Sequence, residues 1–182
     1  MPFSTLKTER LILRRFTEAD LPTLLVYRND PEIARYQSWE SFSEDEAQAF
    51  LQEQQSLEPG TPGKWFQFAI ELQSSGLLVG DCALHVDEPG QQGEIGFTLA
   101  REHQGKGFAT EAVLQVCDYA FANLNLHRLV AITDCRNQSS VAVLERLRFR
   151  REGHFIQHIL FKGEWGDEYL YAILKDEWGK RR

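Results

Sequence analysis

The chain has 182 residues, of which 42% are hydrophobic and 12% aromatic, proportions that fit a globular protein and exclude a disordered one. One domain is the simplest arrangement at this length, so residues 1–182 are predicted to form a single domain. The formal net charge of -7 disfavours direct nucleic-acid binding, which needs a basic face, and weakly favours a cationic partner.

Membrane insertion, export and metal binding find no support in the sequence. No apolar run approaches the ~20 residues that a membrane helix needs, and the first residues lack the apolar core of a signal peptide. Cys82, Cys117 and Cys135 are odd in number and lack CxxC or Cys/His spacing, so they indicate reduced thiols and no metal site. We therefore expect a soluble cytoplasmic protein, monomeric or homodimeric.

The N-terminal third is predicted to hold one strand and two helices. Residues 10–16 have strand composition, and Thr17 offers an N-cap for a helix that the sequence Asn-Asp-Pro at 29–31 ends. Ser43 and Glu46 form a capping box, which predicts the start of a second helix.

Three successive antiparallel strands are predicted next. They span residues 65–72, 77–86 and 93–99, with turns at residues 74–76 and 87–93. Apolar side chains alternate along the first of them, as in a strand with one buried face.

A glycine-rich loop directly follows the third of these strands. Gly105 and Gly107 have no Cβ, so the backbone can turn sharply and bring N–H groups near a ligand. A helical pattern starts here and ends near Asn123, and the first N–H groups of a helix favour an anion such as phosphate. Gly-Lys is followed by Gly rather than Ser or Thr, and a third dinucleotide-type glycine is missing, so a P-loop or Rossmann site is excluded. On the glycines alone, a simple tight turn is the favoured interpretation.

The C-terminal third is predicted to alternate between strands and a helix. A strand at residues 127–134 completes a strand-helix-strand unit, which predicts a parallel pair with a right-handed crossover. A short helix follows within residues 137–149, and two last strands, 151–161 and 168–174, flank a connection. We expect residues 178–182 to be frayed.

The order Gln104-x-x-Gly107-x-Ala109 after a Glu-Ile-Gly-Phe strand resembles the acyl-CoA pyrophosphate loop of the GNAT superfamily of N-acetyltransferases. The resemblance extends in order over nearly the whole chain. It implies an α/β (α+β) fold with a mixed central sheet of about seven strands and helices on both faces. It also implies that the two strands of the parallel pair splay apart at one end, where the thioester arm of acetyl-CoA enters. In this fold the first two helices wall the acceptor pocket.

A second signature, Asn137-x-x-Ser140, is similar to the family's segment before a short helix and Gly-Phe. Arg148 stands where that glycine is usual, so a left-handed C-cap is less comfortable here. The run Gly-x-Trp-x-Asp at residues 163–167 looks like that of the Rim-type enzymes, which acetylate the N-termini of ribosomal proteins.

The resemblance implies a set of residues that bind acetyl-CoA. The backbone of residues 97–99 is expected to bind the pantetheine amides and residues 104–110 the pyrophosphate. Lys106 either adds charge or points into solvent, and Asn137 either bonds the pantetheine or forms an Asx-type turn. The predicted cofactor-binding residues are Phe97, Thr98, Leu99, Gln104, Gly105, Lys106, Gly107, Phe108, Ala109, Thr110 and Asn137.

Two residues are candidates for acid-base catalysis. Glu94 is the candidate base, directly or through water, and a positioning role or a pairing with lysine is an equal alternative. Many GNAT enzymes use a tyrosine as the acid, but Leu144 occupies the matching position here. Ser140 is the substitute acid, and its alternative role is an early-turn hydroxyl of the following helix. Glu111 is better explained as a first-turn charge, and a covalent role for Cys135 is disfavoured.

Three functions remain open from the sequence. The first is an acetyl-CoA-dependent N-acetyltransferase that acts on a protein N-terminus, plausibly a basic ribosomal protein, by direct attack in a ternary complex. The second keeps the chemistry but takes a small amine, such as a polyamine, an amino acid or an aminoglycoside. The third is a non-catalytic acyl-CoA-binding protein.

Overall fold

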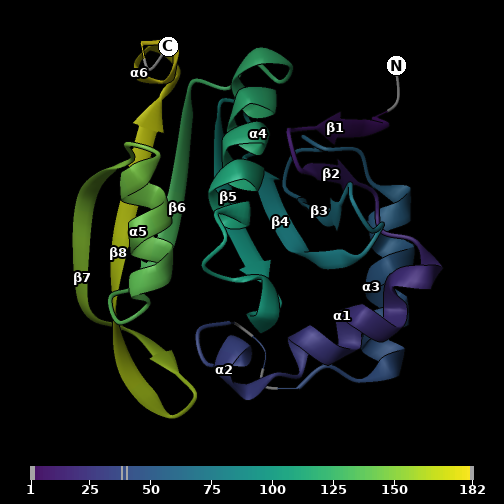
Figure 1. Ribbon diagram of the computed structural model, residues 1–182. Helices are drawn as coiled ribbons and strands as arrows, with labels where there is room; N and C mark the ends of the chain where they lie inside the picture. The colour runs from purple at the N-terminus through teal and green to yellow at the C-terminus, as the bar shows by residue number, and fades with distance from the viewer. Residues whose placement is uncertain (1–2, 38, 40, 181–182) are drawn as a thin grey trace.

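The computed structural model describes residues 3–37, 39 and 41–180, and its centre is a mixed sheet (Figure 1). Within this part of the chain the sheet has eight strands in the order β1-β2-β3-β4-β5-β6-β8-β7. The strands are β1 (Thr5–Lys7), β2 (Leu11–Arg14), β3 (Trp65–Leu72), β4 (Leu78–Val86), β5 (Gln92–Leu99), β6 (Arg128–Asp134), β7 (Arg150–Phe161) and β8 (Glu164–Leu174).

Helices cover both faces of this sheet, as predicted. Their bounds are α1 (Leu21–Arg28), α2 (Pro31–Ala34), α3 (Glu44–Ser56), α4 (Phe108–Ala122), α5 (Gln138–Arg146) and α6 (Lys175–Gly179), with 3₁₀ turns η1 (Glu18–Asp20) and η2 (Arg101–His103). Phe68 and Ile70 of β3 belong to the core under α4, whereas Ala69 between them packs with Leu24 of α1 and Leu51 of α3. Because neighbouring strand residues point to opposite faces, the sheet separates two cores.

The pairing of β5 and β6 defines the most important feature of the sheet. These strands are parallel, which confirms the predicted pair, and all other neighbours are antiparallel. Their register stops at Glu94 and Val130, so residues 95–99 and 131–134 are not paired with each other. We call this separation the splay. Figure 1 shows the two ribbons diverging beside α4 and α5.

The structure corrects three expectations about the ends of elements. The sheet has eight strands rather than about seven because the short β1 pairs with β2. The turn between β7 and β8 is only Lys162 and Gly163, both with positive φ, so the following residues 164–167 belong to β8. The C-terminal segment is helical rather than frayed up to Gly179, because Trp178 is buried and its Nε1 donates to Asp118 Oδ1 at 2.7 Å. Residues 181–182 lie outside the described chain.

The end of α5 has a left-handed residue, although the sequence indicated that Arg148 is less suited than glycine to that conformation. Arg148 has φ 63°, its N–H donates to the carbonyl of Glu145, and the N–H of Phe149 donates to that of Leu144. These bonds form a Schellman motif in which an arginine takes the position usually held by glycine. Among the described residues, no helix is both long and apolar enough for a membrane span.

Candidate functional site

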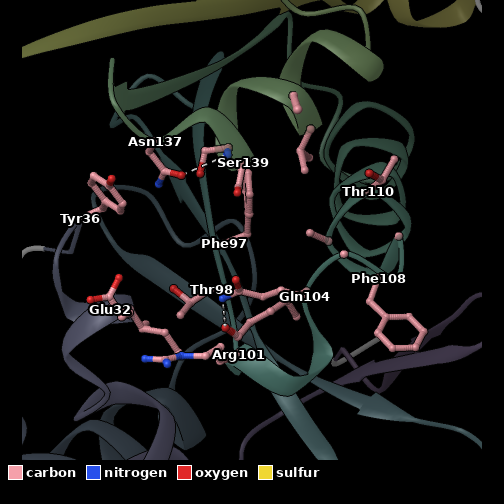
Figure 2. A pocket seen from close by; sticks show the side chains of 18 of the residues that line it. Glu32, Tyr36, Phe97, Thr98, Arg101, Gln104, Phe108, Thr110, Asn137 and Ser139 are labelled. Atoms are coloured by element: carbon pink, nitrogen blue, oxygen red, sulfur yellow. Dashed lines mark hydrogen bonds between the residues drawn. The ribbon is translucent and has the colours of Figure 1, made fainter.

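A groove of about 570 Å³ lies beside the splay, between the first turns of α4 and α5 and the segment around α2 (Figure 2). Three parts of the chain that are distant in sequence contribute its walls. The lining residues are Glu32, Ile33, Tyr36, Gln37, Phe97, Thr98, Leu99, Arg101, Gln104, Gly105, Gly107, Phe108, Ala109, Thr110, Asn137, Ser139, Ser140, Ala142, Val143 and Arg146.

The glycine loop shapes one end of the groove. Gly105 and Gly107 have φ of 73° and 84°, in the left-handed region that favours glycine, and a Cβ at Gly105 would meet nothing within 4 Å. Gly107 is the N-cap of α4, and the first helical N–H with a backbone acceptor is that of Glu111. The N–H groups of residues 108–110 precede it at the positive end of a 15-residue helix. This geometry fits a pyrophosphate.

The glycine loop is held in place by residues that precede β2. Arg10 donates to the carbonyl of Lys106 at 3.0 Å and to the carboxylate of Glu111 at 2.7 Å, and its guanidinium lies 4.6 Å from the ring of Phe108. Thr8 also donates to Glu111. Burial opposes ionisation of Glu111, but these hydrogen bonds lower its pKa overall. Glu111 therefore has a structural role, because it joins the first turn of α4 to the segment before β2.

The end of β5 offers unpaired backbone to the groove. Its residues 97–99 pair with β4 on one edge but have no β6 partner on the other. Peptide groups on an open strand edge can bond an extended amide chain as a further strand would, and pantetheine is such a chain. The side chain of Gln104 donates to the carbonyl of Leu99 at 2.9 Å, so it ties the loop to the strand (Figure 2).

The first turn of α5 forms the facing wall. Asn137 caps this helix, because its side-chain oxygen accepts the N–H of Ser140 at 3.2 Å. The Asx-type role of Asn137 is therefore present, and its role in binding pantetheine stays a prediction. Ser140 and Ser139 both line the groove. Leu144 is fully buried, so a tyrosine hydroxyl has no counterpart at that position.

Glu94 lies away from this groove. Ile95 belongs to the core under α4, so the preceding side chain points to the opposite face of the sheet. Burial raises the pKa of the Glu94 carboxyl, nearby Glu168 raises it further, and His85 opposes the shift. Glu94 is also the last residue of β5 that pairs with β6, so it stands where the splay begins.

Eleven of the thirteen sequence candidates line the groove, and Lys106 and Glu94 do not. The sequence analysis expected the first two helices to wall a pocket but assigned none of the groove residues there, which include Glu32, Tyr36 and Gln37. It also did not assign Arg101 or the residues of α5 beyond Ser140. Gln37 donates to the hydroxyl of Thr98 at 3.1 Å, across 61 positions of sequence. No local pattern signals such a contact.

The thiol nearest to α5 does not have the properties of a nucleophile. Burial raises the pKa of Cys135, neighbouring Asp167 and Asp134 raise it as well, and a bond with Tyr169 opposes them. A raised pKa keeps the thiol protonated near neutral pH.

The sequence matches a known domain over most of its length. Residues 10–150 match the acetyltransferase (GNAT) domain family. An uncharacterized N-acetyltransferase, p20 of Bacillus licheniformis, is 35% identical over 175 residues, which cover 96% of this chain and 98% of that protein. The crystal structure of a GNAT-family acetyltransferase from Bacillus anthracis superposes with a TM-score of 0.87 at 31% identity, covering 95% of this chain and 99% of that one.

Other relatives have named acceptors. The [ribosomal protein uS5]-alanine N-acetyltransferase of Escherichia coli is 31% identical over 84 residues, which are 46% of this chain and 43% of that enzyme. A spermidine N-acetyltransferase from Vibrio cholerae, solved with CoA and spermine, has a TM-score of 0.82 at 25% identity, covering 94% of this chain and 99% of that one. The chain belongs to the GNAT acetyltransferase family and is an N-acetyltransferase that transfers the acetyl group of acetyl-CoA to an amine.

Proposed function

We propose that the acceptor is the N-terminal amine of a protein, with basic ribosomal proteins as the substrate class. The observation that carries this proposal is the surface beside Glu94. Ile132 lies on the same face as Val130, the partner of Glu94, and its side chain is 41% exposed. An acidic group with an exposed apolar neighbour suits the first residues of a polypeptide better than a small polyamine.

The sequence motifs support the same acceptor. The Gly-x-Trp-x-Asp run at 163–167 is similar to that of Rim-type enzymes, and Asn137-x-x-Ser140 is similar to the matching segment of the wider GNAT family. A relative that covers 46% of the chain acetylates the alanine of a ribosomal protein. The net charge of -7 suits a basic polypeptide acceptor.

In this proposal, acetyl-CoA supplies the activated acetyl group from the groove, and the amine enters the splay from the opposite face. A peptide α-amine has a pKa of ~7.7–8.0, so part of it is already neutral near pH 7 and only a modest base is needed. Glu94 takes the proton that the attacking nitrogen loses, directly or through water. Its raised pKa brings it closer to neutral pH, where a base works best.

Ser140 completes the proposed machinery. Its hydroxyl donates a proton to the departing thiolate of CoA, which is a good leaving group and needs little help. The open edge of β5 orients the pantetheine so that the thioester lies in the splay, and direct transfer takes place in a ternary complex.

A small-amine acceptor is the second candidate, because a relative of 25% identity was solved with spermine. A screen of acceptors distinguishes the two. Basic peptides that start with Ser or Ala, the same peptides with an acetylated N-terminus, polyamines and aminoglycosides are each incubated with the enzyme and acetyl-CoA, and products are identified by mass spectrometry. We expect acetylation of the free α-amine and none of the blocked peptides. Acetylation of polyamines or aminoglycosides alone would contradict the proposal.

A further inference from the structure

Arg146 is a groove residue that the sequence motifs do not assign. It lies in the last turn of α5, and its side chain crosses to α4, where Nη1 donates to the hydroxyl of Thr110 at 3.1 Å. Thr110 is the third residue of α4. The guanidinium therefore lies at the positive end of that helix, on the side of the groove opposite to Arg10 and β2.

Two helix ends act on this exposed guanidinium in opposite directions, because the last turn of α5 favours a cation whereas the first turn of α4 disfavours one. The N-terminus of a helix carries partial positive charge and repels a cation. Arg10, the other arginine at the loop, is neutralised by Glu111, whereas no carboxylate lies within 4.0 Å of the Arg146 guanidinium in the described part of the chain. An anion between Arg146 and the first turn of α4 would relieve the repulsion.

We propose that Arg146 binds the pyrophosphate of acetyl-CoA from the α5 side of the groove, facing the N–H groups of the glycine loop. This inference rests on acetyl-CoA lying in the groove, as the proposed function requires. A guanidinium has five N–H donors, of which one bonds Thr110, and its planar fork matches phosphate oxygens. Lys106, for which either added charge or a position in solvent was expected, does not line the groove, so Arg146 supplies the charge there.

The test compares the affinities of Arg146→Gln and the wild-type protein for CoA and for 3′-dephospho-CoA, measured by isothermal titration calorimetry. We expect Arg146→Gln to bind both compounds about tenfold more weakly, because the lost contact is a charged hydrogen bond to a phosphate that both contain. Arg146→Lys retains the charge without the fork and should recover part of the affinity.

Arg148→Gln is the matched control. Arg148 lies two residues further along, is exposed, loses the same charge on substitution and does not line the groove. It should bind CoA as the wild type does. The unliganded Arg146→Gln protein should melt only slightly below the wild type, because it loses an exposed hydrogen bond to Thr110 and a cation that favours the last turn of α5. The loss of CoA affinity should therefore be seen at temperatures where both proteins are fully folded.

Each other result overturns the inference in a recognisable way. Equal CoA affinity in Arg146→Gln and wild type, or equal losses in both variants, would overturn the role of Arg146. If Arg146→Gln weakens the binding of CoA but not that of 3′-dephospho-CoA, Arg146 contacts the 3′-phosphate, and the pyrophosphate contact is overturned. No CoA binding by the wild type would overturn the cofactor assignment itself. Because the titration needs no acceptor, a failure of the acceptor proposal does not affect it.

Discussion

The two faces of the splay present different atoms to their substrates. On the α4 and α5 side, the proposed donor contacts are mostly backbone N–H and C=O groups of the glycine loop and of the open edge of β5, with Arg146 as an added side chain. On the other side, where we propose that the acceptor binds, lie side chains such as Glu94, His85 and Ile132. The donor site therefore depends on backbone shape and on the absence of Cβ atoms, whereas the acceptor site depends on the identity of a few side chains.

The largest effect should come from filling the glycine loop. Gly107→Trp should weaken binding of acetyl-CoA more than ~100-fold, because its side chain displaces a phosphate from at least two N–H donors. Gly76→Trp is the matched control, since Gly76 also has positive φ and an added Cβ there would meet nothing within 4 Å. The readout is the rise in melting temperature with acetyl-CoA, which the control should retain. A retained rise in Gly107→Trp would show that the loop is not the phosphate site.

Removing the acid at the start of the splay should give the next largest effect. Glu94→Gln should lower kcat about 100-fold while the affinity for acetyl-CoA stays unchanged. Because the folded-state pKa of Glu94 is raised above 4.5, the basic form is populated only as pH rises through that higher value. The wild-type rate should therefore rise with pH in two steps, one through the raised pKa of Glu94 and one through the pKa of the acceptor α-amine at ~7.7–8.0, and only the lower step should be absent from Glu94→Gln. An unchanged lower step would assign Glu94 a positioning role instead.

A smaller loss is expected at the first turn of α5. Ser140→Ala should lower kcat about tenfold, which corresponds to one hydrogen bond to a developing charge. Ser139→Ala, on the neighbouring groove residue, should leave kcat within about twofold of the wild type. Steady-state release of CoA from acetyl-CoA measures both. Equal rates for Ser140→Ala and wild type would show that Ser140 is not the proton donor to the thiolate. Full activity in both Glu94→Gln and Ser140→Ala would favour a non-catalytic protein.

The smallest effect concerns stability rather than chemistry. Arg148→Gly should raise the free energy of unfolding by ~0.5–1 kcal/mol, because a left-handed residue with a Cβ is strained and glycine is not, although glycine has more entropy to lose. Chemical denaturation at equilibrium gives this value. A loss of stability would mean that the Arg148 side chain contributes contacts that outweigh its strain.

The donor side was predictable because its residues are contiguous. The strand, the glycine loop and α4 follow each other within about thirty positions, and periodicity and turn chemistry mark each of them. The helix cap at Ser43 was predictable for the same reason, because its side chain accepts the N–H of Glu46, only three residues away. Gly80 is an instructive exception, because a Cβ there would lie 2.1 Å from the carbonyl of Thr98, a constraint that only the pairing of β4 and β5 creates.

The groove wall near α2 and the chain end could not be predicted, because long-range contacts determine them. The hydroxyl of Thr98 accepts a bond from Gln37, and the indole of Trp178 bonds Asp118 across 60 positions. The three residues of β1 are too few to show alternation and are strand only because β2 lies beside them. Likewise no local pattern signals that Arg146, an exposed residue of α5, bonds Thr110 of α4.

The most direct test of the whole account uses a conjugate that joins the sulfur of CoA through an acetyl bridge to the α-amine of a Ser-starting basic peptide. If donor and acceptor meet through the splay, the conjugate should bind at least about tenfold more tightly than CoA, and this gain should be absent when the bridge joins CoA to spermine. Titration calorimetry of both conjugates and of CoA gives the answer. A peptide conjugate that binds no more tightly than CoA would contradict the account.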